Sequence, residues 1–505
     1  MILHVDGEIN RYYVQSLCMV FFPGATFSEG EISGEGIPEV SVRVYTDPLG
    51  DSVCAEVEMK LNDRSCIATE RVGLNEEIYI STHASVAVGR ALFAAGKELL
   101  GHIPPWGILT GIRPAKIAGA LLAEGKGVIK TKRILRDEYF LNPQKAALAV
   151  SVATQEIKLL RKFDKNTCSL YVSIPFCPSR CAYCSFVSYT TPRLLSLMDE
   201  YVDALKFDLA ETFDTINTLG LRLNTIYIGG GTPTTLSPKL LESLLSFIAK
   251  KTDVSALTEF TLEAGRPDTI TAKKLAIAKK YGVTRISVNP QTLSNDILRE
   301  IGRRHTVDDF YSAYEIARAS GIRDINVDLI AGLPGDDFKN FSDTLDKVLA
   351  LNPTNITVHT FCVKKASDAL RNNSGIYSIS GLDTAKCVSY SQLNTKFAGY
   401  KPYYMYRQKN AVGNLENVGF SLEGHEGMYN IYMMEEVQTI FAVGAGAVTK
   451  LVDYRSPVEE GKTRISRIFR EKYPYEYLRE YEKRKSNDPT AKRSIKEQAV
   501  EFFSL

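Results

Sequence analysis

The sequence predicts an α/β protein built around a parallel β/α barrel, complete or partial, with an N-terminal α+β accessory domain and a mostly helical C-terminal extension. From residue 168 onward, six short apolar segments alternate with segments of amphipathic helical periodicity, as parallel strands and their crossover helices do. Before that point, segments of partial period-2 alternation are separated by turn-forming clusters. Beyond residue 375 the alternation of strands and helices fades. We therefore expect three domains, over residues 1–160, 161–375 and 376–505.

The N-terminal domain is expected to contain an antiparallel meander followed by helices. The strand segments are Glu39–Thr46, Ser52–Leu61 and residues 65–72, and each carries alternating apolar residues that would bury one face of a sheet. Residues 84–100 are rich in Ala, Leu and Val and predict a helix that ends near Gly101. Further helical periodicity follows over residues 110–160.

Six apolar segments are expected to form the parallel strands of the barrel. Because the active groups of such barrels lie where strands end and loops begin, the residues that directly follow these segments are the informative ones. The segments are CSLYVSI (168–174), NTIYIGG (224–230), EFTLEA (259–264), RISVN (285–289), INVDLIAG (325–332) and NITVHTF (355–361).

Composition excludes several classes of protein. The 505 residues carry 61 Lys+Arg against 59 Asp+Glu, so bulk charge gives no reason to expect nucleic-acid binding. We see no run of 18 apolar residues and no secretory signal, and we expect no membrane span. Nine cysteines are too sparse for a disulfide scaffold, which favours a reduced, cytoplasmic protein. Residues 461–505 hold 12 Lys+Arg against 7 Asp+Glu, and we expect this basic tail to be a solvated face.

Three cysteines, Cys177, Cys181 and Cys184, are packed into eight residues directly after the first predicted barrel strand. Three thiolates on one loop can converge on one metal centre, and all-thiolate ligation favours an iron–sulfur cluster or zinc. A four-iron cube would keep one iron open, as catalytic metal sites do. Cys168 is a poor fourth ligand because six residues of extended chain place it about 20 Å back along the strand.

The cysteine motif resembles that of radical S-adenosylmethionine (SAM) enzymes, which carry C-x3-C-x2-C with an aromatic residue, here Tyr183, before the last cysteine. The context YVSIPFCPSRCAYCSF is more narrowly similar to the oxygen-independent coproporphyrinogen III oxidase (dehydrogenase) family. The blocks GGGTPT, FTLEAGRPD, GVTRISVNPQTLSNDILREIGRRHT and NVDLIAGLPGD follow in the order found in that family. WGILTGIRPAKI and YMYRQKNAVGNLENVGF look most like its HemZ-type branch.

The resemblance implies a partial (β/α)6 barrel and a specific chemistry. A 4Fe-4S cluster on Cys177, Cys181 and Cys184 would bind SAM at its open iron, and one electron would release a 5′-deoxyadenosyl radical. The radical would take hydrogen from coproporphyrinogen III propionates, which lose carbon dioxide and become the vinyl groups of protoporphyrinogen IX, in heme biosynthesis. The implied partners are the tetrapyrrole substrate and a flavodoxin- or ferredoxin-type electron donor, and we expect a monomer.

The same resemblance implies a set of residues that bind SAM. The glycines and Thr232 follow a strand, Glu263 ends one, and Gln291, Arg303 and Asp328 keep the spacing of the family. For each residue alone, an ordinary turn, core or surface position is the alternative. The set is Tyr171, Phe186, Gly229, Gly230, Gly231, Thr232, Glu263, Gln291, Arg303 and Asp328. We expect the three thiols to face these groups at the opening of the barrel.

A porphyrinogen is a broad apolar ring with four carboxylates, so its site should be aromatic with a few basic groups at the rim. The candidates are Tyr404, Tyr406, Arg407, Lys364 and Lys365. The alternative is that the tyrosine-rich segment KPYYMYRQKN is an amphipathic surface strand or helix. His359 has no partner at ligand spacing and is expected to be structural.

One departure from the family pattern and two other functions stay open. The family commonly has His where this chain has Ser173, which affects details of substrate protonation rather than the cluster. A heme chaperone on the same scaffold would bind heme without turnover. A radical SAM enzyme acting on another tetrapyrrole would give a product of different mass.

Overall fold

The computed structural model of the chain describes residues 1–28, 36–80, 82–111, 113–184, 188–362, 376–454 and 463–504, with residues 376–382 described by their backbone. The chain divides into two compact units. One comprises Met1–Leu159, Ser374–Ala385 and Met405–Asn417, and the other comprises Leu160–Asn373, Lys386–Tyr404 and Val418–Leu505. Among the described residues no helix combines the length and the apolar character that a membrane crossing requires.

The first unit contains a four-stranded sheet in the order β1-β2-β3-β4. β2, β3 and β4 pair antiparallel as the predicted meander, whereas β1, which the sequence did not predict, pairs parallel with β2. Val40 and Val42 lie opposite Met59 and Val57, and all four are buried, so the alternation reflects one buried face. The strands are β1 (Ile2–Asp6), β2 (Glu39–Thr46), β3 (Ser52–Leu61) and β4 (Arg64–Gly73).

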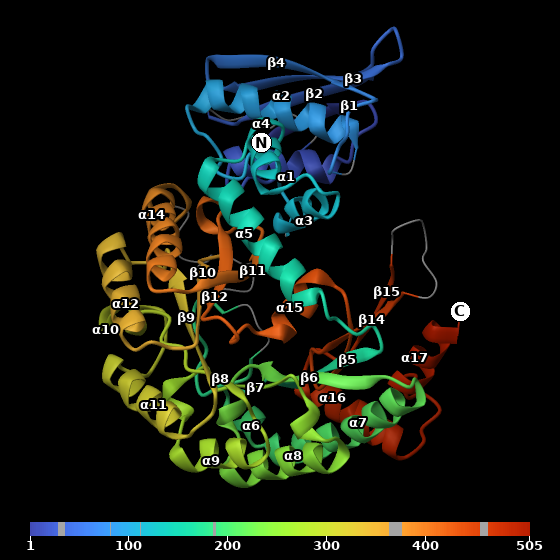
Figure 1. Ribbon diagram of the computed structural model, residues 1–505, viewed down its shortest axis with the longest axis vertical. Helices are drawn as coiled ribbons and strands as arrows, with labels where there is room; N and C mark the ends of the chain where they lie inside the picture. The colour runs from blue at the N-terminus through green and yellow to red at the C-terminus, as the bar shows by residue number, and fades with distance from the viewer. Residues whose placement is uncertain are drawn as a thin grey trace. The chain divides into compact units, whose positions relative to one another are not determined.

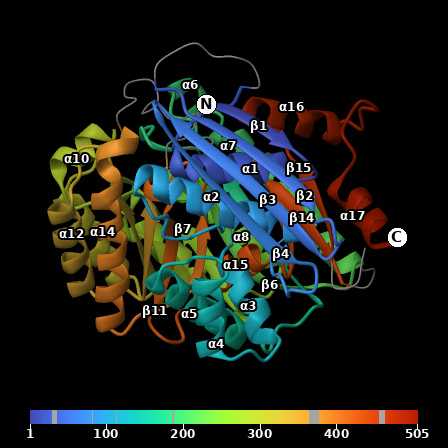
Figure 2. The same ribbon diagram turned by 90° about the horizontal axis from the view of Figure 1, so that it is seen from above.

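The described part of residues 1–160 also forms five helices, and α2 packs against β3 and β4 (Figure 2). α2 begins after Thr82, whose hydroxyl accepts a hydrogen bond from Ser85 N at 3.1 Å, and ends at Gly101 in the left-handed conformation with φ 66°. The end predicted near Gly101 is therefore confirmed. The helices are α1 (Arg11–Phe21), α2 (His83–Leu100), α3 (Ala115–Ala123), α4 (Val128–Asp137) and α5 (Pro143–Leu160).

The second unit is built on six parallel strands that run in chain order from β5 to β10. Their side chains are buried almost continuously, as in a sheet covered on both faces. The strands are β5 (Thr167–Ile174), β6 (Arg222–Gly230), β7 (Glu259–Glu263), β8 (Arg285–Ser287), β9 (Asp324–Ala331) and β10 (Asn355–Thr360).

Crossover helices lie along the outer side of these strands (Figure 1). The strand-then-helix order makes each connection a crossover that returns the chain to the same end of the sheet, so the carboxyl ends of all six strands meet at one edge. The helices are α6 (Pro192–Leu195), α7 (Met198–Thr218), α8 (Pro238–Lys251), α9 (Ala272–Lys280), α10 (Asn295–Glu300), α11 (Val307–Ala319) and α12 (Phe338–Ala350).

The parallel strands form a partial barrel, because the described strands extend the sheet at both ends instead of closing it. The full order is β11-β12-β10-β9-β8-β7-β6-β5-β13-β14-β15. β13 pairs parallel with β5, and β12 pairs antiparallel with β10. The added strands are β11 (Lys401–Arg407), β12 (Glu416–Ser421), β13 (Thr439–Val443), β14 (Val448–Asp453) and β15 (Arg464–Phe469).

The described part of the C-terminal region contains five strands and four helices. Strand β11 lies in the tyrosine-rich segment for which a strand was one alternative, and the other four strands were not predicted. The expectation of a solvated basic tail is wrong for Arg470 and Arg484, which are nearly buried and pair with buried Asp208 of α7. α16 and α17 pack against α7. The helices are α14 (Ile376–Phe397), α15 (Met428–Glu435), α16 (Pro474–Lys485) and α17 (Ile495–Ser504).

Candidate cluster and cofactor site

The three clustered cysteines lie on residues 177–184, here called the thiol loop, which leaves the carboxyl end of β5. At its start, Cys177 N donates to Tyr189 O at 3.1 Å and Tyr189 N donates to Pro175 O at 2.8 Å. Toward its end, Ala182 N donates to Ile301 O at 3.0 Å. Main-chain hydrogen bonds therefore hold the loop from two sides.

The sulfur atoms of the thiol loop lie close enough to influence one another. Burial raises the pKa of the Cys177 thiol to about 11, the Thr232 hydroxyl lowers it, and the negative charges of Cys184 and Cys181 raise it further. The Thr232 Oγ1 atom lies 3.4 Å from Cys177 Sγ. Because thiolates that repel one another are stabilised by a positively charged metal centre, the donor set is chemically suited to one.

The number of thiolates matches the needs of a cluster. Within the described part of the chain, no group of three His, Cys, Asp or Glu side chains is arranged as the ligands of a single metal ion. In a four-iron cube each protein thiolate binds a different iron. The three thiolates of the thiol loop are the number that a 4Fe-4S cluster with one open iron uses. Cys168 is buried within β5 and pairs there with Leu223 and Thr439 in the sheet.

Arg266, which was not among the predicted site residues, holds the thiol loop in place. Its guanidinium donates to Ser179 O at 3.3 Å, to Ser179 Oγ at 3.0 Å and to Cys181 Sγ at 3.6 Å. Asp268 pairs with the same guanidinium at 3.1 Å, and the Arg266 side chain is 4% exposed. Arg266 is the arginine of the block FTLEAGRPD, which matches the family. However, its neighbours in the sequence do not indicate that its side chain contacts a cysteine sulfur.

The glycines of residues 229–231 lie where β6 ends against β5. Gly230 has φ 107°, and a Cβ added to Gly231 would lie 2.6 Å from Phe176 O. Gly231 N donates to Ile174 O and Thr232 N donates to Phe176 O, each at 2.8 Å. The glycines therefore allow this segment to approach the start of the thiol loop closely, and they bring Thr232 to Cys177.

Four neighbouring parallel strands, and the residues just after a fifth, β8, each contribute one polar side chain to a group that we call the strand-end cluster, made of Tyr227, Glu263, Asn289, Asp328 and His359. The Tyr227 hydroxyl donates to Glu263 Oε1. Asn289 Nδ2 donates to Asp328 Oδ2 at 2.7 Å, and His359 Nε2 lies 3.8 Å from the same oxygen. The sequence predicted Glu263 and Asp328, whereas Tyr227, Asn289 and His359 emerge from the fold.

The two carboxyl groups of the strand-end cluster differ in acidity. Burial raises the pKa of Glu263 to about 7, although the Tyr227 hydroxyl lowers it, and the negative charge of Asp328 raises it further. Burial also acts to raise the pKa of Asp328, but hydrogen bonding and charge from His359 outweigh it, so that this pKa is lower than usual. The cluster thus holds one readily ionised carboxylate beside one that titrates near neutrality.

Three stacked tyrosines lie against Glu263. The ring centroids of Tyr171 and Tyr227 are 6.1 Å apart, and those of Tyr227 and Tyr429 are 4.6 Å apart. Tyr171 is a predicted cofactor contact, and this stack makes it part of an aromatic wall. Ser173, two residues further along β5, donates to Ala445 O at 2.9 Å, so its hydroxyl is used to join β5 to the C-terminal region.

Gln291 lies at the same edge of the sheet in a left-handed backbone conformation. Gln291 has φ 70° and pairs with β9 through Asp328 O and Ile330 N. Its buried Oε1 atom has no hydrogen-bond partner among the described residues. A left-handed non-glycine residue with an unmet acceptor is costly, and such strain is often found at binding sites.

Arg303 links the thiol loop to the strand-end cluster. Its guanidinium donates to Tyr183 Oη at 2.8 Å, and to Gly265 O and Asn289 O at 2.7 Å each. Its Nε atom donates to His305 Nδ1 at 3.4 Å. Four hydrogen bonds within the protein therefore occupy the group that the resemblance assigns to a SAM carboxylate.

The residues predicted to bind substrate are placed less favourably. Lys364 and Lys365 lie outside the described residues, as does Phe186, which was predicted as a cofactor contact. The buried guanidinium of Arg407 donates to Leu109 O and, at 2.5 Å, to Asn414 Oδ1. Tyr404 is buried and its ring packs on Gly419, and Tyr406 is half-buried. Because Arg407 and Tyr404 are used inside the protein, this geometry does not support them as substrate contacts.

Comparison with known proteins assigns the chain to a family. Residues 171–348 match the radical SAM superfamily. The oxygen-independent coproporphyrinogen-III oxidase-like protein HemZ of Bacillus subtilis (strain 168) is 40% identical over 352 residues, which cover 69% of this chain and 70% of HemZ. The chain belongs to this family of oxidase-like proteins. Radical SAM proteins use a 4Fe-4S cluster and SAM, so the resemblance, the fold class and both cofactors predicted from the sequence are confirmed.

The family includes proteins of heme metabolism with different activities. The heme chaperone HemW of Bacillus subtilis (strain 168) is 38% identical over 197 residues, which cover 39% of this chain and 51% of HemW. The solved structure of the radical SAM coproporphyrinogen III oxidase HemN from Escherichia coli is 19% identical, covers 65% of this chain and 72% of HemN, and superposes with a TM-score of 0.49.

Proposed function

We propose that the protein catalyses the oxygen-independent oxidative decarboxylation of coproporphyrinogen III, which converts propionate side chains into the vinyl groups of protoporphyrinogen IX. The observation that carries the proposal is the junction made by Arg303, which hydrogen-bonds to Tyr183 of the thiol loop and to Asn289 of the strand-end cluster. This junction supports a single site that contains the proposed metal ligands and the proposed polar cofactor contacts. The similarity to HemZ supports the choice of substrate.

The side chains of this site are suited to hold both cofactors. Cys177, Cys181 and Cys184 would bind three irons and leave the fourth open. The unmet acceptor of Gln291 suits an amino or hydroxyl group of SAM, and the carboxyl group of Glu263 suits its cationic amino group. The bound cluster and SAM would supply one-electron radical chemistry for the removal of a hydrogen atom from a propionate.

The chain's own residues control charge around that reaction. A cationic amino group beside Glu263 would stabilise its carboxylate and lower a pKa that burial holds at about 7. The Tyr227 hydroxyl donates a hydrogen bond to the Glu263 carboxyl group and thereby keeps that carboxyl oxygen oriented. Each propionate loses one hydrogen atom, one electron and carbon dioxide, so an electron acceptor takes part as a co-reactant.

Anaerobic turnover tests the proposal. The iron-reconstituted protein is incubated with SAM, a reductant and coproporphyrinogen III, and 5′-deoxyadenosine, carbon dioxide and porphyrin mass are measured. We expect the loss of carbon dioxide plus two hydrogens from each converted propionate. Cys184→Ser should abolish all three signals, whereas Cys66→Ser, in β4 of the first unit, should leave them unchanged. Formation of 5′-deoxyadenosine without a vinyl product rejects the substrate, and a different porphyrin mass indicates another tetrapyrrole reaction.

The similarity to HemW favours heme chaperone activity as the second candidate. A chaperone would bind heme in a stable complex and transfer it to an acceptor protein without releasing carbon dioxide. Titration of the purified protein with heme, followed by the Soret band, and transfer to an apo-hemoprotein measure that activity. Heme transfer without decarboxylation would replace the first proposal with the second.

A further inference from the structure

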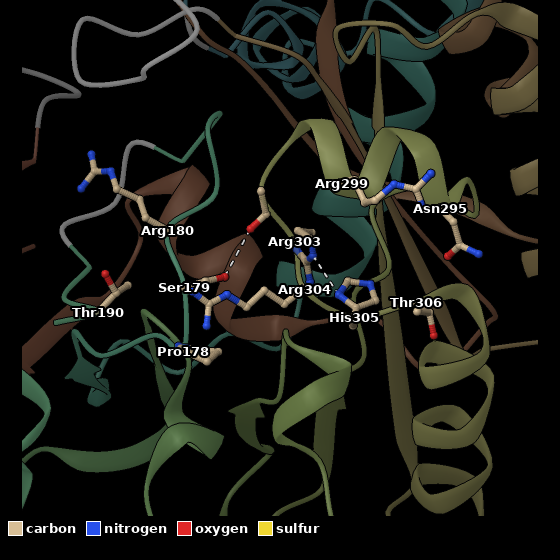
Figure 3. Close-up of a pocket in the computed structure, with 11 residues that line it drawn as sticks. Pro178, Ser179, Arg180, Thr190, Asn295, Arg299, Arg303, Arg304, His305 and Thr306 are labelled. Carbon is tan, nitrogen blue, oxygen red and sulfur yellow. Dashed lines mark hydrogen bonds between the residues drawn. The ribbon is translucent and has the colours of Figure 1, made fainter. Parts of the chain in front are cut away.

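A cavity of about 640 Å³ lies next to the thiol loop and is rich in arginine. We call it the arginine pocket and define it by Ser179, Arg180, Arg299, Arg303, Arg304 and His305 (Figure 3). The residues that line it come from the thiol loop, from the segment around Thr190, and from residues 295–306. None of the strand-end cluster is among the described residues that line it, and Arg303 is the one predicted cofactor contact that the lining includes.

One wall of the pocket is formed by residues 178–180, which join the predicted metal ligands Cys177 and Cys181. Ser179, between Cys177 and Cys181, donates from Oγ to Gly302 O at 3.3 Å. A Cβ added to Gly302 would lie 3.1 Å from Arg180 O, so residues 302–305 pack directly on the thiol loop. A molecule that occupies the pocket is therefore separated from the thiols by the thickness of one loop.

The charge of the pocket is positive. Arg299 and Arg304 are exposed, and no Asp or Glu is among the described residues that line the cavity. The nearby acidic groups are already used: Asp296 pairs with Arg299, and Asp309 accepts from Thr306 N at 2.7 Å at the start of α11. Arg304 has no ion-pair partner within the described residues. An anionic partner would thus meet Arg304, and Arg299 whose ion pair with Asp296 lies exposed at the surface.

His305 adds a second observation that points to a ligand. Its Nδ1 atom accepts a hydrogen bond from Arg303 Nε at 3.4 Å, so the ring proton of the neutral imidazole resides on Nε2. Burial lowers the pKa of His305 to about 3, and the charges of Arg303 and Arg266 lower it further. The side chain is 3% exposed, and Nε2 has no partner among the described residues. The pocket therefore holds an unused donor as well as positive charge.

We propose that the arginine pocket is the docking site of an acidic one-electron carrier protein, whose surface carboxylates pair with Arg299 and Arg304. The inference rests on the proposed radical function, because only one-electron chemistry at the thiol loop requires such a donor. In the reaction one electron leaves the reduced carrier and enters the site held by the three thiols, and no atom is transferred. Electrostatic complementarity of this kind raises association rates and weakens with salt.

The test compares the reconstituted protein with the double variant Arg299→Glu/Arg304→Glu. The probe is a flavodoxin of strongly negative net charge, and its binding is measured by calorimetry at low and at high salt. We expect the double variant to lose at least tenfold in affinity, and wild-type binding to weaken at high salt. The milder variant Arg299→Gln/Arg304→Gln should fall between them. Arg318→Glu/Lys347→Glu, with two exposed residues of α11 and α12, is the charge-matched control and should bind like the wild type.

A second readout separates this inference from the proposed function. Formation of 5′-deoxyadenosine is measured with reduced flavodoxin and, separately, with dithionite. The double variant should lose the flavodoxin-driven rate and keep the dithionite-driven rate. Equal flavodoxin affinity in the wild type and the double variant overturns the docking site, even if dithionite supports turnover. If flavodoxin binding depends on the two arginines but neither reductant yields 5′-deoxyadenosine, the docking site stands and the radical function fails.

Discussion

Arg266 is the side chain that most directly connects the fold to the thiol loop. It is nearly buried, it is neutralised by Asp268, and it donates to both the main chain and the hydroxyl of Ser179. Its remaining contact, to Cys181 Sγ at 3.6 Å, is of the kind that tunes iron–sulfur sites, because hydrogen bonds to cluster sulfurs influence the reduction potential. Arg266 therefore acts as a positioning residue that also sets charge beside one ligand.

Replacing Arg266 with glutamine should weaken the site in two measurable ways. The variant loses the cation beside Cys181, so we expect a more negative midpoint potential in a redox titration followed by electron paramagnetic resonance. It also loses part of the brace on Ser179, so iron bound per chain after reconstitution should fall. Arg222→Gln removes an exposed ion pair with Asp164 and should change neither quantity. An Arg266 variant with wild-type potential and full iron content would remove the role assigned to this residue.

Glu263 should make the stability of the metal-free protein depend on pH. Its folded pKa of about 7 exceeds the ordinary value of 4.5, so the unfolded chain releases the proton first and unfolding becomes easier as pH rises from about 4.5 to about 7. The shift corresponds to roughly 3 kcal/mol at most. Glu263→Gln removes this loss, and urea unfolding should show the variant more stable than wild type at pH 8 and similar at pH 4.5. Equal urea midpoints at pH 8 would show that Glu263 titrates normally.

At the level of elements, the ends of β5 and β6 act together. The thiol loop leaves β5 where the 229–231 segment leaves β6, and two main-chain hydrogen bonds of 2.8 Å from Gly231 and Thr232 join them. Gly231 has no room for a Cβ beside Phe176 O, so the close approach depends on glycine. This junction also sets the position of Thr232 relative to Cys177.

Gly231→Ala should separate the two strand ends and disturb the thiol loop without unfolding the sheet. We expect a lower melting temperature and a loss of iron binding after reconstitution, because the new Cβ would lie 2.6 Å from a main-chain oxygen. The matched control is Gly119→Ala in α3, where an added Cβ meets nothing within 4 Å. There alanine should stabilise the helix by about 0.5–1 kcal/mol. Full iron binding by Gly231→Ala would contradict the close-packing argument.

At the scale of the whole chain, the C-terminal residues complete the sheet of the second unit. β13 continues the parallel sheet beside β5, and α16 packs against α7, where buried Asp208 accepts from Tyr477 Oη at 2.7 Å and pairs with Arg470 at 3.5 Å and with Arg484. Residues 405–417 are likewise part of the core of the first unit. Glu416 is buried there, forms an ion pair with Lys145 at 2.5 Å and accepts a hydrogen bond from Trp106 Nε1 at 2.7 Å.

Asp208→Ala should be strongly destabilising. The substitution leaves two nearly buried guanidinium groups without their shared carboxylate, and breaking a buried ion pair costs about 3–5 kcal/mol. We expect the urea midpoint followed by far-ultraviolet circular dichroism to fall clearly. Lys485→Ala, at the end of helix α16, removes an exposed pair with Glu482 and should change stability by less than about 0.5 kcal/mol. Similar midpoints for the two variants would show that Asp208 does not anchor the C-terminal helices.

Local patterns were sufficient for the strands β5–β10, for the meander of β2–β4 and for the spacing of the three thiols, because side-chain periodicity and ligand spacing depend on neighbours in the chain. They also indicated Glu263, Gln291 and Asp328 through a family resemblance. The strands β11–β15, the brace from Arg266, the burial of Arg407 and the arginine pocket depended on partners far apart in the chain. Whether an arginine faces water, a carbonyl or a sulfur is decided by the residues that packing brings against it, and only the folded chain contains that information.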